Sequence, residues 1–336
     1  MVNWTCSSSS YPEFLQSEDF LRSTLHIQTT LGIPIHVFGA YCILFKTPKQ
    51  MSDMKWAMFN LHCWSVAFDL CVGFLFIPYL QLPAIAGVGL GLLTDFGIFL
   101  GDQAYFGMSV LGGVVVSVAC LFETRFFHLY AKHTTWKCLR RPWLGANFML
   151  AFTYLIPTYI FLPEQVSARR DLKAYIPCLP DFLFTDRFFI VTVHRGRVAA
   201  NIGVVMLPIP GESMLFVFLI YWNMRQFSTI ARLSKSTLKL QRKFLSALIF
   251  QVTIPIATLL LPILYFQYSI AIYYYNQGWN NVGIFIISMH GTASSIAMIL
   301  IHKPYRDTLI GYFKGPQKTL AEFTAKISHA SHVTIT

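Results

Sequence analysis

Charged side chains are scarce in this chain. Asp, Glu, Lys and Arg make up only 12% of the 336 residues, about half of their usual share in soluble domains. Hydrophobic residues account for 55%. A water-soluble fold of this length and composition would expose large apolar patches, which favour association. The composition therefore excludes an ordinary soluble domain and favours a protein that folds in lipid.

The longest stretch without charge is 244–302, which contains no Asp, Glu, Lys or Arg. A helix needs about 20 apolar residues to cross roughly 30 Å of hydrocarbon, so this stretch is too long for one span. The polar and aromatic residues 273–281 divide it. We therefore predict two spans, 244–271 and 282–302.

Five further apolar stretches of similar length precede this one: 25–45, 56–80, 103–129, 143–163 and 199–222. The first has no basic leader and no small-residue cleavage site, so it is typical of a retained signal anchor. The apolar run 84–93 could begin an eighth span, although Asp95 interrupts it. The distribution of basic residues distinguishes the two counts.

With seven spans and an outside N-terminus, most of the 26 Lys and Arg residues fall in cytoplasmic loops and the tail. An eighth span would place the basic loops 46–55 and 223–243 on opposite faces, against the positive-inside rule. We therefore predict an all-α membrane protein, a seven-transmembrane helix bundle with its N-terminus outside and its C-terminus inside. Basic blocks between apolar stretches fit the anionic inner leaflet better than nucleic acid.

The predicted organisation has three parts. Residues 1–24 form an extracellular segment, 25–302 the transmembrane domain, and 303–336 a cytoplasmic tail. The tail opens with apolar residues spaced as in a short amphipathic helix along the inner membrane surface.

Few residues are available for covalent features on the outer side. Of seven cysteines only Cys6 and Cys178 are placed outside, and they either form a bridge or remain two unpaired thiols, because pairing cannot be deduced from sequence. Asn3 begins the one glycosylation motif, Asn3-Trp4-Thr5.

Arrangements typical of enzymes are missing. Gly87, Gly89 and Gly91 resemble a glycine-rich loop, but no strand followed by Lys-Ser or Lys-Thr accompanies them to bind phosphate. The ten histidines are scattered, and no nucleophile–base arrangement is visible. We expect no catalysis, metal or cofactor.

Charges inside the predicted spans are few and therefore informative, because such charges are costly and usually functional or paired. Asp69 requires a polar network or an ion, and Glu212 either faces a cavity or is neutral and hydrogen-bonded. Glu123 and Arg125 lie at the cytoplasmic end of the third span. Arg125 either holds the inner ends of other helices or snorkels beside a local carboxylate.

Several ordered motifs carry a family resemblance. They are Phe45-Lys46-Thr47-Pro48, Asn60-Leu61-His62, Leu121-Phe122-Glu123-Thr124-Arg125, Ile176-Pro177-Cys178, Leu240-Gln241-Arg242-Lys243-Phe244 and His302-Lys303-Pro304-Tyr305-Arg306. From about residue 20 to 315 the chain resembles the nematode class H serpentine receptors (Srh), which are G-protein-coupled chemoreceptors. Thr124 stands where that family usually has Asn.

The resemblance implies a plasma-membrane receptor in the cilia of sensory neurons, signalling through heterotrimeric G proteins. It assigns an activation switch to Glu123 and Arg125, with Pro304, Tyr305 and Arg306 closing the seventh helix. The chain departs from rhodopsin-like receptors because it has no cysteine between Asp95 and Phe106 and no lysine in the seventh span for retinal.

Our hypothesis is a small-molecule chemoreceptor. The candidate ligand pocket comprises Gln103, Tyr105, Glu212, Phe266, Gln267 and Tyr268, and the candidate contacts to G protein or lipid are Arg232, Lys235, Lys239, Arg242 and Lys243. Two alternatives remain. A ligand-gated olfactory-type channel would have the reverse orientation, and a secondary transporter would need repeated halves and a charged midplane pathway.

Overall fold

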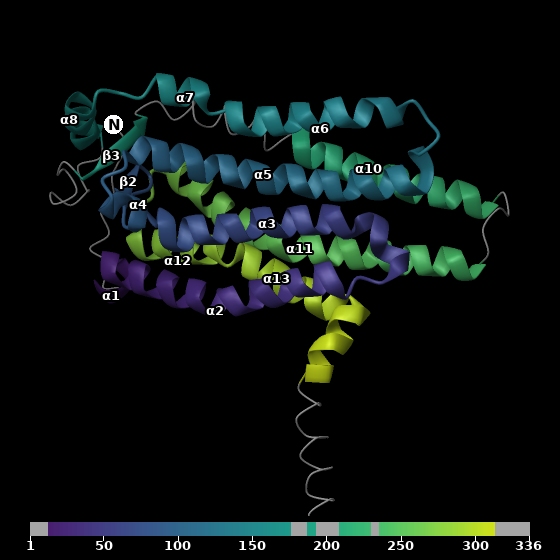
Figure 1. The fold of residues 1–336 in the computed structure, drawn as a ribbon. Helices are drawn as coiled ribbons and strands as arrows, with labels where there is room; N and C mark the ends of the chain where they lie inside the picture. Colours follow the sequence, from purple (N-terminus) through teal and green to yellow (C-terminus); the bar gives the residue numbers. More distant parts are fainter. Residues whose placement is uncertain (1–12, 176–186, 193–207, 230–234, 313–336) are drawn as a thin grey trace, which may run out of the picture.

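The computed structural model describes residues 13–175, 187–192, 208–229 and 235–312. It is an elongated bundle of helices that run side by side, with a small sheet at one end (Figure 1). We call this the sheet end and the opposite one the far end.

The helices are α1 (Glu13–Gln16), α2 (Glu18–Phe45), η1 (Lys49–Met54), α3 (Lys55–Leu70), η2 (Cys71–Leu75), α4 (Leu92–Asp95), α5 (Leu100–Phe126), η3 (Phe127–Ala131), α6 (Trp136–Thr153), α7 (Ile156–Ile160), α8 (Gln165–Tyr175), α10 (Pro208–Thr229), α11 (Lys235–Ile272), α12 (Gln277–Ser288) and α13 (His290–Ile301).

Three helical segments are long and apolar enough to cross a membrane: Glu18–Phe45, Met51–Leu75 and Leu100–Ala131. The count rises to five if two bent pairs each form one span. These pairs are Trp136–Ile160 with Gln165–Leu172, bent by 81°, and Gln277–Ser288 with His290–Ile301, bent by 42°. The described part of the chain therefore has several potential membrane spans.

The outward face of α2 shows the pattern expected of a helix in lipid. Ile27, Leu31 and Val37 are each more than 60% exposed, whereas Leu21 and Leu25 are fully buried. Ser17 begins this helix, since its hydroxyl accepts a hydrogen bond from the Phe20 amide at 3.1 Å. The helix thus starts before the apolar stretch predicted at 25–45.

Helix α5 lies at the centre of the bundle and packs against α3, α6 and α10. Two glycines allow this close approach. A Cβ atom at Gly112 would lie 2.9 Å from the carbonyl oxygen of Ala151, and one at Gly113 would lie 2.5 Å from the ring of Trp64. Small residues at helix contacts are typical of membrane bundles.

The prediction of an all-α fold is wrong in one part. Strands β1 (Pro78–Leu80), β2 (Ile85–Gly89) and β3 (Phe189–Thr192) form an antiparallel sheet in that order. The run 84–93, considered as the start of an eighth span, is mainly β2 and the beginning of α4. Its tight pairing requires Gly87, where a Cβ atom would lie 2.4 Å from the carbonyl oxygen of Tyr79.

Helix ends also differ from the predicted spans. The second helical segment ends at Leu75 rather than residue 80, because the chain enters β1. The fourth begins at Trp136 rather than 143, so Arg140 and Arg141 are part of the helix. The seventh is divided at Met289 into α12 and α13.

Candidate functional site

A buried carboxylate joins α5 to α6 near the far end. Glu123 is 2% exposed, and its Oε1 accepts a hydrogen bond from the indole N–H of Trp136 at 2.8 Å. Its Oε2 accepts one from Arg140 at 2.9 Å. The Arg140 guanidinium also lies 4.0 Å from the centre of the Phe127 ring. We call Glu123, Trp136 and Arg140 the α5–α6 clamp.

Arg125 occupies a different environment from Glu123. Its side chain is partly buried, and its titratable neighbours are Tyr130 and Asp53. Glu123, the carboxylate closest to Arg125 in sequence, is hydrogen-bonded to α6 instead. Nearby, Nδ1 of His128 lies 3.4 Å from Oδ2 of Asp53, so η3, which follows α5, is linked to η1.

The predicted switch residues after the seventh helix separate into a buried and an exposed group. Tyr305 is fully buried, and its hydroxyl lies 2.7 Å from that of Thr47, after the end of α2. Arg306 is exposed and donates to the carbonyl of Leu300 at 3.2 Å. Tyr305 thus links the end of the seventh helix to the first loop.

Asp69 of α3 holds the beginning of α13. Its Oδ1 accepts a hydrogen bond from the Gly291 amide at 2.7 Å. Its Oδ2 accepts from the Thr292 amide at 2.7 Å and from the Thr292 hydroxyl at 2.9 Å. The bend at Met289 frees these amides, and a carboxylate at a helix N-terminus stabilises them. Asp69 therefore acts as the cap of a helix that begins inside the bundle.

Two histidines and a serine surround this cap. Nε2 of His36 lies 3.3 Å from Oδ2 of Asp69, and its Nδ1 lies 3.1 Å from the hydroxyl of Ser295. Nε2 of His62 lies 3.0 Å from the carbonyl oxygen of His36. We call these three residues with Asp69 and Thr292 the Asp69 network. Both carboxylate oxygens have protein partners, which favours a structural polar network over an ion site.

The six residues of the predicted ligand pocket are distributed over α5, α10 and α11. Gln103 is buried and donates to the Ile98 carbonyl at 2.7 Å, while the Tyr105 hydroxyl donates to the Phe152 carbonyl. Both side chains therefore support neighbouring segments.

The three candidates on α11 have separate surroundings. The ring of Phe266 packs so closely on Gly283 that a Cβ atom there would lie 2.6 Å away. Gln267 and Tyr268 are exposed.

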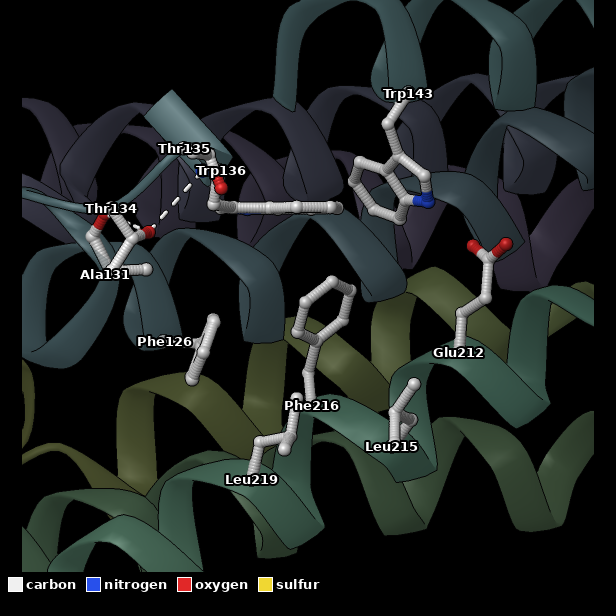
Figure 2. A pocket seen from close by; sticks show the side chains of 10 residues that line it. All are labelled: Phe126, Ala131, Thr134, Thr135, Trp136, Trp143, Glu212, Leu215, Phe216 and Leu219. Atoms are coloured by element: carbon white, nitrogen blue, oxygen red, sulfur yellow. Dashed lines mark hydrogen bonds between the residues drawn. The ribbon is translucent and has the colours of Figure 1, made fainter. Parts of the chain in front are cut away.

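Glu212 lines a cavity of about 370 Å³ at the outer side of α5, between α6 and α10 (Figure 2). The lining residues are Phe126, Ala131, Thr134, Thr135, Trp136, Trp143, Glu212, Leu215, Phe216 and Leu219. None of the other five predicted pocket residues is among them. Oε2 of Glu212 is buried and has no hydrogen-bond partner among the residues that the structure describes.

The sheet is tied to the surrounding helices by side chains. Asn280 is fully buried and donates to the Leu82 carbonyl at 3.3 Å. Arg22 donates to the Leu90 carbonyl at 3.0 Å. Gln165 exchanges two hydrogen bonds with the backbone of Ile190, at 3.1 and 2.9 Å. The sheet therefore covers this end of the bundle as a fixed lid.

Helix α8, beside the sheet, begins with a carboxylate cap. Glu164 accepts from the amides of Val166 and Ser167 at 2.9 and 2.7 Å. These hydrogen bonds, chiefly that from Ser167, hold the pKa of Glu164 below its usual value.

Some predicted residues lie outside the described part of the chain: Asn3, Cys6, Cys178 and Arg232. Lys235, Lys239, Arg242 and Lys243 belong to the first turns of α11, at the far end, and the last three of them are exposed.

Sequence reasoning missed Trp136, Arg140 and Trp143 as site residues. The signal was present, because positions four and seven residues apart lie on one face of a helix. Their helix was predicted to begin only at residue 143, which placed Arg140 and Trp136 in a loop.

Comparison with known proteins agrees with the earlier resemblance. Residues 16–315 match the family model of the serpentine type 7TM GPCR chemoreceptor Srh. Serpentine receptor class H-72 of Caenorhabditis elegans is 26% identical over 302 residues, which cover 88% of this chain and 86% of that protein. The chain therefore belongs to the Srh family of serpentine chemoreceptors, which are multi-pass membrane receptors rather than enzymes.

Proposed function

We propose that this receptor detects a small environmental molecule and signals to a heterotrimeric G protein at the plasma membrane of a sensory cilium. The α5–α6 clamp is the observation that carries this proposal. A buried carboxylate is held by two donors from another helix in the closed state, and the proposed open state lacks these hydrogen bonds. Such elements are typical of switching proteins.

The proposed topology has seven spans, with the sheet end outside and the far end in the cytoplasm. The three long segments and the two bent pairs supply five spans. Helices α10 and α11 supply the other two, because each is long enough to cross the hydrocarbon. The positive-inside rule supports this orientation, since the basic start of α11 lies at the far end. The proposal keeps the three parts predicted from the sequence: the extracellular segment 1–24, the transmembrane domain 25–302 and the cytoplasmic tail 303–336.

In the proposed mechanism the ligand shifts an equilibrium between two arrangements of the far end. In the arrangement seen here Glu123 is held by α6. Ligand binding favours an arrangement in which the clamp opens and α5 and Arg125 become available to the G protein. The basic residues at the start of α11 contact the G protein or the anionic inner leaflet.

The proposed ligand contacts are Phe266, Gln267 and Tyr268 on α11. We assign Gln103 and Tyr105 a supporting role, because their polar atoms are used to hold the segments around the start of α5. The lid implies that the ligand reaches the bundle beside the sheet.

A screen of volatile and water-soluble molecules tests the function in cells that express the full chain with a G-protein reporter. An epitope at Met1 is stained in parallel without permeabilisation. Surface staining with a ligand-dependent G-protein response supports the proposal. Ligand-dependent current without surface staining supports the reversed channel instead, and saturable uptake of the ligand supports a transporter.

A further inference from the structure

The cavity beside Glu212 opens on the outside of the bundle. Leu215 of α10, at its edge, is 52% exposed, whereas Phe216 deeper inside is 5% exposed. The exposed Thr134 and Thr135 belong to the turn before α6, at the far end. In a membrane the outer surface of such a bundle faces the acyl chains. A molecule dissolved in the bilayer therefore has direct access to this cavity.

Four of the ten lining residues are aromatic: Phe126, Trp136, Trp143 and Phe216 (Figure 2). The rings of Trp136 and Trp143 have centroids 5.9 Å apart, and that of Phe216 lies 5.9 and 5.4 Å from them. Indole faces are electron-rich and attract cations, more strongly when water is excluded. The wall is thus suited to an apolar group that carries a positive charge.

Glu212 supplies the polar end. In Figure 2 its carboxyl group lies beside the indole nitrogen of Trp143, and its other polar neighbour is Asn147. Both groups are neutral, and no Lys or Arg is among the ten lining residues. Two arginines precede Trp143 on α6: Arg140 is committed to Glu123, and Arg141 is exposed. A carboxyl group at such a depth needs compensation, and the described part of the chain supplies no donor to its Oε2.

We propose that this cavity binds a lipophilic amine that enters from the bilayer. The ammonium group donates to Oε2 of Glu212, and the hydrocarbon tail lies along Phe216 and Leu219. The volume of about 370 Å³ is within the usual range for small-molecule sites. An alcohol supplies the hydrogen bond without the charge, and a carboxylate supplies like charge, so both bind more weakly.

Trp136 connects this site to the clamp. One side of its indole lines the cavity, and its N–H donates to Glu123 at 2.8 Å. An occupant that moves the indole therefore changes the hold of α6 on Glu123. This consequence for signalling rests on the proposed function, whereas binding of the amine does not.

Photolabelling of the purified full-length receptor in phosphatidylcholine nanodiscs tests the binding. The probe is a dodecylamine that carries a diazirine, and dodecanol with the same diazirine is the neutral comparison. Mass spectrometry of the digest locates the label. We expect the amine to label peptides that contain 136–143 and 212–219, and dodecanol to label them roughly tenfold less.

Glu212→Gln keeps the shape of the side chain and removes its charge. It should reduce labelling by the amine to the level of the alcohol, whereas Glu164→Gln, at an exposed carboxylate outside the cavity, should leave labelling unchanged. If Glu212→Gln does not fold, Leu215→Trp is measured instead, since a larger side chain at the exposed edge blocks entry. Equal labelling by amine and alcohol, or full labelling of the folded variant, overturns the proposal. Either result is independent of any signalling assay.

Discussion

Oε2 of Glu123 on α5 accepts a hydrogen bond from the guanidinium of Arg140 on α6 at 2.9 Å. The two residues differ in exposure, since the Glu123 side chain is 2% exposed and that of Arg140 is 26% exposed. Removing the base therefore leaves a buried carboxylate with Trp136 as its remaining donor among the described residues, whereas removing the acid leaves a base that can turn toward solvent. The two partners are not equivalent.

Arg140→Met should destabilise the closed far end by about 1–3 kcal/mol, because the carboxylate of Glu123 loses its charged partner. We expect a lower unfolding temperature and raised signalling without ligand, measured by thermal unfolding and a G-protein reporter. Lys137→Met, at an exposed base one turn earlier, is the matched control. Basal signalling and stability equal to those of the parent would remove the clamp from the mechanism.

Arg125→Ala should abolish ligand-driven signalling while surface expression persists. The reason is the role assigned to this guanidinium in contacting the G protein when α5 is released. Reporter output and surface staining are measured in the same cells. Arg141→Ala, at an exposed base of α6, controls for loss of positive charge near this end. An unchanged ligand response would show that Arg125 has no part in activation.

Asp69→Asn should lower the free energy of unfolding by about 2–4 kcal/mol, since three hydrogen bonds from α13 lose a charged acceptor. Denaturant unfolding in detergent measures this loss. Hydrogen exchange should also rise at the amides of Gly291 and Thr292. Asp307→Asn, at an exposed acid after the seventh helix, should be neutral within error. If the free energies of unfolding of Asp69→Asn and Asp307→Asn were equal, the hydrogen bonds from Asp69 to α13 would not stabilise the fold.

Asn280→Ala should loosen the lid without unfolding the bundle. The buried amide donates to the Leu82 carbonyl and accepts from the Tyr265 hydroxyl, both at 3.3 Å. Truncation removes the donor to the Leu82 carbonyl at a cost of about 1–3 kcal/mol, whereas the Tyr265 hydroxyl keeps the Asn276 carbonyl at 3.4 Å. We expect faster hydrogen exchange in 78–90, with α5 unchanged. Trp279→Phe, on the exposed side of the same turn, is the control. Uniform exchange across the chain would show global destabilisation instead.

The helical character of the chain was predictable because a helix that crosses the lipid bilayer requires a long apolar run in the sequence. The importance of Asp69 and Glu123 was also predictable, since an acid at such a position requires a partner. The identity of those partners was not. Asp69 accepts hydrogen bonds from amides 222 and 223 residues away in the sequence. A local sequence pattern cannot indicate a partner at that separation.

The sheet and the bend could not be predicted for related reasons. β2 is a short apolar run, and runs of this length do not distinguish strand from helix. Its partner β3 lies about a hundred residues later in the chain. The bend at Met289 follows no proline, and the amides that it frees are stabilised from another helix. The backbone acceptors of two predicted pocket residues, the Ile98 carbonyl for Gln103 and the Phe152 carbonyl for Tyr105, were not predictable either.

The cap on α13 also constrains how the protein is made. Asp69 enters the membrane 222 residues before Gly291 is synthesised, a delay of roughly 10–45 s at ordinary translation rates. During that interval its carboxylate has His36 of the preceding helix as a neighbour, but none of the amides that it will later bind. Arrival of the last helix supplies them. Biogenesis of the receptor is therefore completed at its C-terminal end, and truncation before residue 291 should yield an insertion intermediate that quality control recognises.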